Sequence, residues 1–569
     1  MCGIAGILGV NPKNVSTIKL MAEAQKHRGP DALHFWNDEK LALGHNRLSI
    51  IDLSESASQP MISNCGNYVI VFNGEIYNYL ELKKELEKEY DFVTDSDTEV
   101  LLAAYIKWNT KTLDKLNGMF SFAIWNKKAN TLFSGRDRFG VKPFYFTFFE
   151  NQFYFSSEIK ALFAAGISKK QNQKVWANYY TFGTYGLPDE TFFEGIQQLK
   201  AGHFFEIVFE KNLDFSVLKT QQWYNFPERI SKIKRLSKEE LKVCYEALLK
   251  DSIQLRFRAD VPLGMNVSGG LDSSTLINLV SRNLPSQKNI QAFTFYSNDE
   301  KYDELPWVNE LMKETAYPLH KVLLDYKEVP DLIEKVSFYQ DEPFGGFPTL
   351  AYSLLFESAK GKGVKVILDG QGMDEAWAGY DYYHDKSNNV IQGIISSPVR
   401  PEALVTEFRN MAQKEVYERP FDNDLQNLQY RDLFYTKIPR ALRFNDRISM
   451  MHSTELREPF LDYRLIELAF AQSDAMKIQN GQTKWLLRDL VKDYLGNTIA
   501  LAPKRALQTP QREWISQELK PYFSEKIEQF SKMDFVDCKQ IKVLWKDYCD
   551  GKQDNSFYIW QWVNGLVLS

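Results

Sequence analysis

The sequence predicts a mixed fold in two parts: an α+β part built on antiparallel strands, then an α/β part built on a parallel sheet, with a helical tail. The 569 residues are too many for one hydrophobic core, which favours about two to four domains. Short apolar runs broken by Gly, Asn and Asp dominate the chain to about residue 206, and this spacing is typical of antiparallel strands joined by turns. After Ser237, strands, glycine turns and helices alternate, which is typical of a parallel sheet.

The first part, residues 1–210, shows its predicted strands as apolar runs. The clearest runs are Tyr68–Phe72, Phe120–Trp125 and Phe144–Phe149. One predicted helix interrupts them, because Tyr79–Lys88 is dense in Leu, Glu and Lys. A mixed, charged stretch, residues 211–236, is the predicted linker.

The second part, residues 237–569, begins with a helix signal. Ser237-Lys238-Glu239-Glu240 has the pattern of a capping box and predicts a helix that reaches about Gln254. A strand over Gly264–Val267 then enters a glycine-rich turn, and a helix follows over Ser273–Val280. Val364–Leu368 is typical of a buried parallel strand. The last third is predicted to be mainly helical, and ligands are expected at the carboxyl ends of the strands.

Composition and charge exclude several classes of protein. A net charge of −5 and a pI near 6.0 give no electrostatic case for nucleic acid as a partner. No stretch approaches the ~18–20 uninterrupted apolar residues that span a bilayer, and the start lacks the pattern of a signal peptide. The five cysteines form no CxxC or CxxH pair, so we expect reduced thiols in a cytoplasmic enzyme without membrane partners.

The turn Ser268-Gly269-Gly270-Leu271-Asp272-Ser273-Ser274 has the composition of a phosphate-binding loop. Glycines let backbone N–H groups approach an anion closely, and the following helix places its N-terminus behind them. Asp272 is out of place in a loop that binds anions, unless Mg²⁺ bridges its carboxylate and a phosphate. No Gly-Lys-Ser/Thr follows, so this is not a Walker A motif.

A second glycine turn repeats this logic. Asp369-Gly370-Gln371-Gly372 follows a predicted strand and is followed in turn by Asp374 and Glu375. Two glycine turns with separate carboxylates favour a site for Mg-pyrophosphate over a plain strand-to-helix turn without a ligand.

Cys2 stands out among the cysteines, because removal of Met1 would place its thiol beside a free α-amine. Such an amine can take the thiol proton and so activate the sulfur as a nucleophile. A nucleophilic thiol and a pyrophosphate loop in one chain indicate an enzyme with two sites. One site would release ammonia, and the other would use ATP to attach it.

These residues resemble known families. The loop Ser268–Ser274 matches the SGGLDSS loop of N-type ATP pyrophosphatases, which form acyl-adenylates. The N-terminal third resembles class II glutamine amidotransferases, and nearly the whole chain is similar to glutamine-hydrolysing asparagine synthetases. The resemblance implies an Ntn-hydrolase αββα antiparallel sandwich in residues 1–210 and a parallel-sheet ATP-pyrophosphatase domain with a helical tail in residues 237–569.

Four segments of the first part occur in the order that this family shows: His27–Asp31, His45–Ile50, Phe72–Asn78 and Ser96–Glu99. The resemblance implies that Cys2 is the nucleophile and that the Asn73 amide and the Gly74 N–H stabilise the oxyanion. It implies that Arg47 clamps the glutamine carboxylate and that Glu75 and Asp97 hold its ammonium group. The implied glutamine-binding residues are Arg47, Leu48, Ser49, Ile50, Asn73, Gly74, Glu75 and Asp97.

The resemblance also implies a set of residues on the ATP side. The implied ATP-binding residues are Asn266, Ser268, Gly269, Gly270, Asp272, Ser273, Ser274, Phe295, Asp369 and Gly370, and the implied magnesium ligands are Asp272 and Asp374. Lys484 would be a catalytic lysine that neutralises charge on the adenylate and the departing pyrophosphate, with Arg488 as its basic neighbour. Asp446–Met450 and Arg457–Asp462 resemble further family segments. Lys504-Arg505 is interpreted either as a phosphate contact or as a plain surface pair.

The second glycine turn departs from the family, where it usually reads Ser-Gly-Glu-Gly-x-Asp-Glu. Here Gln371 takes the place of the glutamate that is implicated in forming the adenylate, and a carboxylate stands two residues earlier at Asp369. A neutral amide can orient a ligand, but it cannot act as a base or balance a cation. We therefore count Gln371 among the catalytic residues and expect the acceptor pocket to be changed.

We predict a glutamine-dependent, AMP-forming ligase that uses ATP and Mg²⁺ to amidate a carboxylate. Aspartate is the first-choice acceptor, which would make the enzyme an asparagine synthase. The alternative is another carboxylate, such as a uronic acid in surface-polysaccharide synthesis, because of Gln371 and Asp369. A β-lactam-forming relative fits less well, since that branch dispenses with the glutaminase cysteine. A homodimer is the assembly to test.

An idle binding or regulatory protein with a relic synthetase domain is the alternative from a different class. The joint presence of Cys2, Asp272, Asp374 and Lys484 argues against it.

Overall fold

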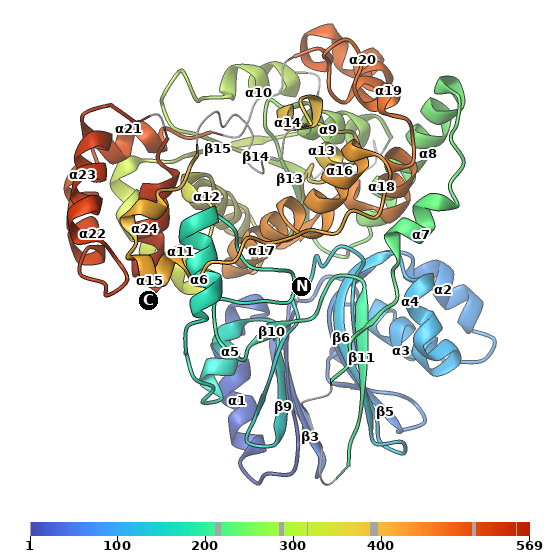
Figure 1. Cartoon of the computed structure of the whole chain (residues 1–569). Helices are drawn as coiled ribbons and strands as arrows, with labels where there is room; N and C mark the ends of the chain where they lie inside the picture. The colour runs from blue at the N-terminus through green and yellow to red at the C-terminus, as the bar shows by residue number, and fades with distance from the viewer. Residues whose placement is uncertain are drawn as a thin grey trace.

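The computed structural model describes residues 2–210, 218–283, 290–313, 315, 317–386, 397–502, 508–553 and 555–568. Over these residues the chain forms two halves, one stacked on the other (Figure 1). The N-terminal half contains two antiparallel sheets, and the C-terminal half contains a parallel sheet surrounded by helices. The predicted fold class, an antiparallel αββα sandwich followed by a parallel α/β part with a helical tail, is confirmed.

The sandwich consists, over the described residues, of two six-stranded sheets with the orders β10-β8-β9-β1-β3-β2 and β12-β11-β7-β6-β5-β4. Its strands are β1 (Gly3–Leu8), β2 (Ala32–Asn37), β3 (Leu41–Arg47), β4 (Met61–Ile62), β5 (Tyr68–Ile76), β6 (Gly118–Asn126), β7 (Thr131–Arg136), β8 (Tyr145–Phe149), β9 (Gln152–Ser156), β10 (Gln197–Gln198), β11 (His203–Val208) and β12 (Gln221–Gln222). The helices of this half are α1 (Asn14–Ala24), α2 (Tyr79–Leu86), α3 (Asp97–Trp108), α4 (Thr112–Lys115), α5 (Ile159–Ala164) and α6 (Gln173–Phe182).

Alternation along β5 explains why both faces of its sheet are covered. Val69 and Val71 point into the core between the two sheets, whereas Ile70 and Phe72 point into the core under α2 and α3. Successive strand residues face opposite sides, so an unbroken apolar run predicts a strand that is buried on both faces. On the other sheet, α1 and α5 provide the outer layer.

The C-terminal half contains a parallel sheet with the order β15-β14-β13-β16-β17 among the described residues. Its strands are β13 (Leu263–Asn266), β14 (Gln291–Tyr296), β15 (Leu319–Leu323), β16 (Val366–Leu368) and β17 (Glu455–Arg457). Its first helices are α7 (Phe226–Ser231), α8 (Lys238–Arg256), α9 (Leu271–Asn283), α10 (Leu305–Met312), α11 (Val329–Gln340), α12 (Gly346–Gly361), α13 (Met373–Ala376) and α14 (Asp381–His384). The later helices are α15 (Thr406–Arg409), α16 (Asp424–Phe434), α17 (Lys437–Met451), α18 (Tyr463–Phe470), α19 (Asp474–Lys477), α20 (Trp485–Ala500), α21 (Gln511–Ser516), α22 (Lys520–Phe530), α23 (Cys538–Cys549) and α24 (Phe557–Leu568).

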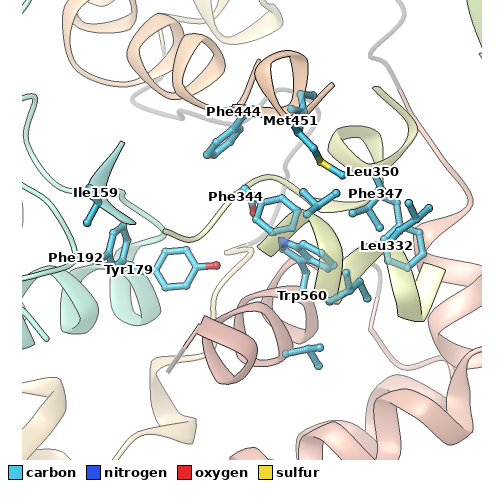
Figure 2. Packing of buried hydrophobic residues seen from close by; sticks show 14 of the residues in the cluster. Ile159, Tyr179, Phe192, Leu332, Phe344, Phe347, Leu350, Phe444, Met451 and Trp560 are labelled. Carbon is cyan, nitrogen blue, oxygen red and sulfur yellow. The ribbon is translucent and has the colours of Figure 1, made fainter. Parts of the chain in front are cut away.

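One hydrophobic core crosses the boundary between the two halves. Figure 2 shows Tyr179 of α6 beside Phe192, and Trp560 of α24 next to Phe344. The indole N–H of Trp560 donates to the Phe344 carbonyl at 2.7 Å. The Gln561 side-chain amide of α24 donates to the carbonyl of Tyr179 at 2.7 Å, so the helical tail is tied directly to α6.

The predicted elements agree with the structure except at the linker. The helix predicted from Ser237 is α8, and both hydrogen bonds of its capping box are present. Residues 211–217 of the predicted linker lie outside the described residues, but β12 pairs with β11 and so belongs to the sandwich sheet. The division at residues 210 and 236 stays a prediction. In the described part of the chain, no helix has both the length and the apolar character needed to cross a membrane.

Candidate functional site

A cavity in the N-terminal half brings together most of the residues predicted to bind glutamine. Cys2, Arg47, Leu48, Ser49, Ile50, Gly74, Glu75 and Asp97 all line it, together with Ile51, Ala57, Gln59, Phe72, Ser96 and Thr98. The lining comes from the ends of β1, β3 and β5 and from the first turn of α3. Residues separated by almost one hundred positions in sequence therefore share one small site.

The backbone around Cys2 is held by two neighbours. Its N–H donates to Oδ1 of Asn73 at 3.1 Å, and its carbonyl accepts from Nε of Arg28 at 3.1 Å. Burial raises the pKa of the Cys2 thiol, so a nearby base is needed to form the thiolate. Among the described residues, the Nδ2 donor of Asn73 is buried and has no hydrogen-bond partner. A donor left unpaired beside a thiol is suited to receive an oxyanion.

Gly74 is a glycine because the strand next to it is too close for a side chain. Its partner in the β5–β6 ladder is Phe120, and a Cβ atom at this position would overlap with the carbonyl oxygen of Met119. A side chain is therefore excluded at this point of the cavity wall.

Arg47 reaches the cavity from the end of β3. Its Nη1 donates to the Ser54 carbonyl at 2.7 Å and to the Ser58 hydroxyl at 3.2 Å, and its Nη2 donates to the Asp52 carbonyl at 2.5 Å. These bonds fix the guanidinium in place, but they use several of the donors that the predicted bidentate clamp on glutamine would need.

Two buried carboxyl groups face the same cavity. Burial raises the pKa of Asp97 to about 7, while its Oδ2 accepts the N–H of Ile76 at 2.8 Å. Burial and the neighbouring carboxylate of Glu455 raise the pKa of Glu75 well above its ordinary value, against the effect of Arg457. An ammonium group bound here would favour the ionised forms of both side chains.

The two predicted glycine turns meet in the C-terminal half. A Cβ atom on Gly370 would lie 3.2 Å from the backbone nitrogen of Ser273, so the second turn rests on the start of α9. Within the first turn, the Ser268 N–H donates to Oγ of Ser273 at 3.1 Å. The cavity beside these turns is lined by Ser268, Gly269, Gly270, Leu271, Asp272, Ser273, Asp374, Gly379, Thr483, Lys484, Arg488, Ile499 and Ala502.

Lys484 lies between the two carboxylates that were predicted as magnesium ligands. Its Nζ is 2.6 Å from Oδ2 of Asp272 and 2.6 Å from Oδ1 of Asp374. Burial opposes its charge, but the two carboxylates raise the pKa of Lys484 above its ordinary value. Its φ of 53° is in the left-handed region, which is uncommon for a residue with a side chain and is typical of strained functional positions.

The oxygen atoms at this cavity fit Mg²⁺. In proteins, Mg²⁺ is usually held by one or two carboxylates together with substrate phosphates, rather than by a cage of protein ligands. Asp272 and Asp374 offer the two carboxylates, and the hydroxyls of Ser268 and Ser273 lie beside them. In the described residues, no group of three or more His, Cys, Asp or Glu side chains forms a metal cage.

A large cavity of about 790 Å³ opens on the other side of the second glycine turn. Asp369 and Gln371 line it, and so do the rings of Tyr185, Tyr352, Tyr380, Phe444 and Trp560 and the cations Lys301, Lys437, Arg440 and Arg512. Burial raises the pKa of Asp369. The volume is near the upper end of the roughly 300–1,000 Å³ found for ligand sites.

Some predicted residues lie apart from these cavities. Asn266 and Phe295 are at the carboxyl ends of β13 and β14, and neither lines the two cavities described around the glycine turns. Ser274 is buried in α9, also away from the cavity surface. Lys504 and Arg505 lie outside the described residues.

The sequence analysis missed Gly379 and Arg457. A Cβ atom on Gly379 would overlap with Oδ1 of Asp374 and with Cε of Lys484, so a glycine is required where the lysine meets the carboxylate. The sequence pattern of Arg457–Asp462 resembles the family but assigns no role to the arginine. No local pattern assigns either residue, since Gly379 is constrained by the distant Lys484 as well as by Asp374, and Arg457 contacts the distant Glu75.

Comparisons with known proteins agree with this division of chemistry. Residues 1–223 match the family described as glutamine amidotransferase domain, and residues 245–569 match the family described as asparagine synthase. Asparagine synthetase [glutamine-hydrolyzing] 1 of Bacillus subtilis (strain 168) is 30% identical, with 98% of this chain and 95% of that protein covered. Asparagine synthetase [glutamine-hydrolyzing] 3 of the same organism is 29% identical, with coverage of 89% and 86%. Amidase chry2 of Gibberella zeae is 25% identical, with coverage of 94% and 93%.

The fold and the two matches define the class of protein, which is an enzyme that carries out glutamine-dependent amidation. Within this class, the chain belongs to the family of glutamine-hydrolysing asparagine synthetases.

Proposed function

We propose that this enzyme releases ammonia from glutamine and uses ATP to convert an acceptor carboxylate into an amide. The observation that carries the proposal is the position of Lys484, which lies between Asp272 and Asp374 where the two glycine turns meet. A buried cation surrounded by carboxylates, hydroxyls and glycine N–H groups is suited to a polyphosphate and its metal ion.

The glutaminase half of the proposed reaction needs the thiol of Cys2 as the nucleophile, after removal of Met1. The sulfur attacks the side-chain carbonyl carbon of glutamine, and the Asn73 amide and the Gly74 N–H receive the oxyanion. The α-amine of Cys2, which has taken the thiol proton, passes it to the departing nitrogen as the carbon–nitrogen bond breaks, so ammonia leaves. Water then hydrolyses the thioester, which releases glutamate and restores the thiol. Arg47, Glu75 and Asp97 would bind the amino-acid end of glutamine, with Leu48, Ser49 and Ile50 as the adjoining wall.

In the synthetase half, an oxygen of the acceptor carboxylate attacks the α-phosphorus of ATP, and pyrophosphate leaves. Ammonia then attacks the carbonyl carbon of the acyl-adenylate, AMP leaves with the bonding electrons, and the amide loses a proton. Lys484 would balance the negative charge, and the turn from Ser268 to Ser274 would hold the phosphates, with Asp369 and Gly370 as further proposed contacts of ATP. Asp272 and Asp374 would hold Mg²⁺, which would supply further charge neutralisation when it is bound. We keep Asn266 and Phe295 as proposed nucleotide contacts.

Aspartate is the first acceptor to test, because the relatives of this chain are named asparagine synthetases. The second candidate is a bulkier carboxylate such as a uronic acid, and two observations favour it. The cavity beside Asp369 has a volume of about 790 Å³, and the amide of Gln371 lines it where the related families usually have a glutamate. A neutral amide can hydrogen-bond a hydroxyl without the penalty of a buried charge.

The decisive experiment is an acceptor screen that measures AMP and pyrophosphate in the presence of glutamine or ammonium. Aspartate and uronic acids are supplied separately, and the amide product is identified. AMP formation that depends on neither acceptor nor ammonia would contradict the proposal.

The same proposal includes a cytoplasmic location, since the reaction consumes ATP and the five cysteines are free. A homodimer stays a prediction.

The variant Gln371→Glu tests the acceptor assignment. We expect it to change the ratio of kcat/KM for aspartate and for uronic acids by about tenfold or more, while the KM for ATP changes much less. Thr349→Ser, a conservative change in the wall of the same cavity, is the matched control. An unchanged acceptor ratio with a large effect on ATP would place Gln371 in the nucleotide site instead.

A further inference from the structure

Arg457 of β17 reaches from the parallel sheet to Glu75, a residue that lines the glutamine cavity of the other half. Its side chain is fully buried, and its Nη2 lies 3.4 Å from Oε2 of Glu75. Glu75 is on β5 of the sandwich and lines the cavity beside Cys2. One wall of the N-terminal site therefore depends on a cation that belongs to the C-terminal half.

The guanidinium is held so that only one orientation is available. Its Nη1 donates to the carbonyls of Arg256 and Arg258 at 2.7 and 2.8 Å, and its Nε donates to Oε1 of Glu455 at 2.5 Å. The planar fork then points Nη2 at Glu75, because the other nitrogens are engaged. A lysine could keep the charge, but it could not make this set of bonds.

The backbone of the same residue contacts the second glycine turn. Arg457 is opposite Leu368 in the β16–β17 ladder, and its carbonyl accepts the N–H of Asp369 at 2.9 Å. Asp369 begins the turn that carries Gln371 to the large cavity. Arg457 therefore contacts both sites: its side chain lies against Glu75 of the glutamine cavity, and its backbone carbonyl binds the first residue of the acceptor turn.

We propose that Arg457 is a positioning residue which completes the glutamine site from the synthetase half and ties that site to the acceptor turn. This inference rests on the proposed function, in which Glu75 binds the ammonium group of glutamine. Without Arg457, Glu75 would face Glu455 and Asp97 with less compensating charge, and it would bind a proton more readily. A protonated carboxyl group is a poor partner for an ammonium ion.

The test compares Arg457→Met and Arg457→Lys in the full-length enzyme. We expect Arg457→Met to raise the KM for glutamine about tenfold or more, while ammonium-dependent amide formation stays within about twofold of the wild type. We expect Arg457→Lys to restore part of the affinity. Arg431→Met, which removes another buried guanidinium from its carboxylate Asp432, is the matched control and should leave the KM for glutamine unchanged.

The pH profile provides a readout that a purely structural role would not move. The groups that face Glu75 are Glu455 and Arg457 from β17, Asp97 and Tyr79 from the helices, Cys2 and the N-terminal amine. Loss of the arginine should move the acid limb of glutamine kcat/KM to higher pH, because Glu75 then ionises at higher pH. The pH profile with ammonium should not show this displacement.

A folded Arg457→Met enzyme with the wild-type KM for glutamine would overturn the proposal. Equal loss of both activities, or failure of both variants to fold, would also overturn it, because either result would make Arg457 a residue of the fold alone. Failure of the proposed function is distinguished by the wild type, which would then show neither glutaminase activity nor ammonium-dependent AMP formation.

Discussion

Glu458 is a carboxyl group placed between the two halves of the molecule. It is 5% exposed and lines a small cavity with Tyr77, Met119, Val141, Arg256 and Leu461, among others. Burial raises the pKa of Glu458 to about 8, against the effect of the cations Lys142 and Arg256. At neutral pH this side chain is therefore mainly protonated in the folded protein.

This predicts a pH-dependent gain in stability from Glu458→Gln. The pKa of the Glu458 carboxyl group rises on folding. The contribution of this group to the free energy of unfolding is therefore complete below about pH 4.5 and is lost as the pH rises through about 8. The amide side chain in the Glu458→Gln variant cannot ionise, so the variant loses no stability from this group in that pH range. The variant should gain on the wild type between pH 5 and 8 by up to a few kcal/mol, since one pKa unit corresponds to about 1.4 kcal/mol.

Thermal or urea unfolding of both proteins across this pH range is the measurement. Glu87→Gln, a change at an exposed residue of the N-terminal half, is the control and should show no such trend. A difference between Glu458→Gln and the wild type that is constant with pH, or that shrinks toward pH 8, would contradict the assignment of a raised pKa.

At the scale of residues, the types and order of the motifs could predict which side chains lie together in a site. They could not predict which oppositely charged side chains balance the buried charges there. The sequence identified Cys2, Gly74 and Asp97, and they line one cavity. It could not predict that Arg457 faces Glu75, because that contact joins positions 382 apart through the docking of two sheets. It also could not predict Lys484 between the carboxylates, which depends on the left-handed backbone of that residue.

At the scale of elements, the pairing of β5 with β6 determines the wall of the glutamine cavity. Gly74 lies close against β6, and a methyl group there would overlap with the backbone of Met119. We predict that Gly74→Ala lowers the free energy of unfolding by about 1–3 kcal/mol, as overpacking does, and lowers glutaminase activity at least tenfold.

Denaturant unfolding and glutamate release measure the two effects. Gly361→Ala is the matched control, because no atom lies within 4 Å of the added Cβ at the end of α12. That change should be neutral or slightly stabilising. A Gly74→Ala enzyme with normal stability and normal glutaminase activity would show that the strands separate easily at this point.

Regular elements were predictable where the local signal and the packing agree. The capping box at Ser237 and the apolar run of β5 are examples, since each follows from residues close together in sequence. β12 was not predictable: Gln221–Gln222 carries no strand pattern, and it is a strand only because β11 offers an edge for it to pair with.

At the scale of the whole molecule, buried polar contacts fix the two halves to each other. Arg28 of the N-terminal half forms ion pairs with Asp446 of α17 at 2.8 Å and with Glu158 at 2.8 Å. The same guanidinium donates to the carbonyl of Cys2. The core around Tyr179 and Trp560 continues across the boundary (Figure 2). The relative placement of the halves therefore contributes to the geometry of the nucleophile.

Because the two halves carry out separate chemistry, we predict that Cys2→Ala removes one activity of the enzyme and spares the other. The sulfur is the proposed nucleophile toward glutamine, but the cavities around Lys484 and Gln371 do not include it. We expect glutamine-dependent amide formation to fall by about 10³-fold or more, whereas ammonium-dependent formation stays within about twofold of the wild type.

Cys65→Ala, at an exposed cysteine, is the control and should leave both activities unchanged. Both rates are measured as amide product and AMP under saturating ATP. Because Cys2 is tied to Asn73 and Arg28 through backbone atoms, the alanine variant keeps these bonds and should fold normally. A folded variant that loses the two activities to the same extent would show that the thiol serves the synthetase half as well, and the separation of the sites would be wrong.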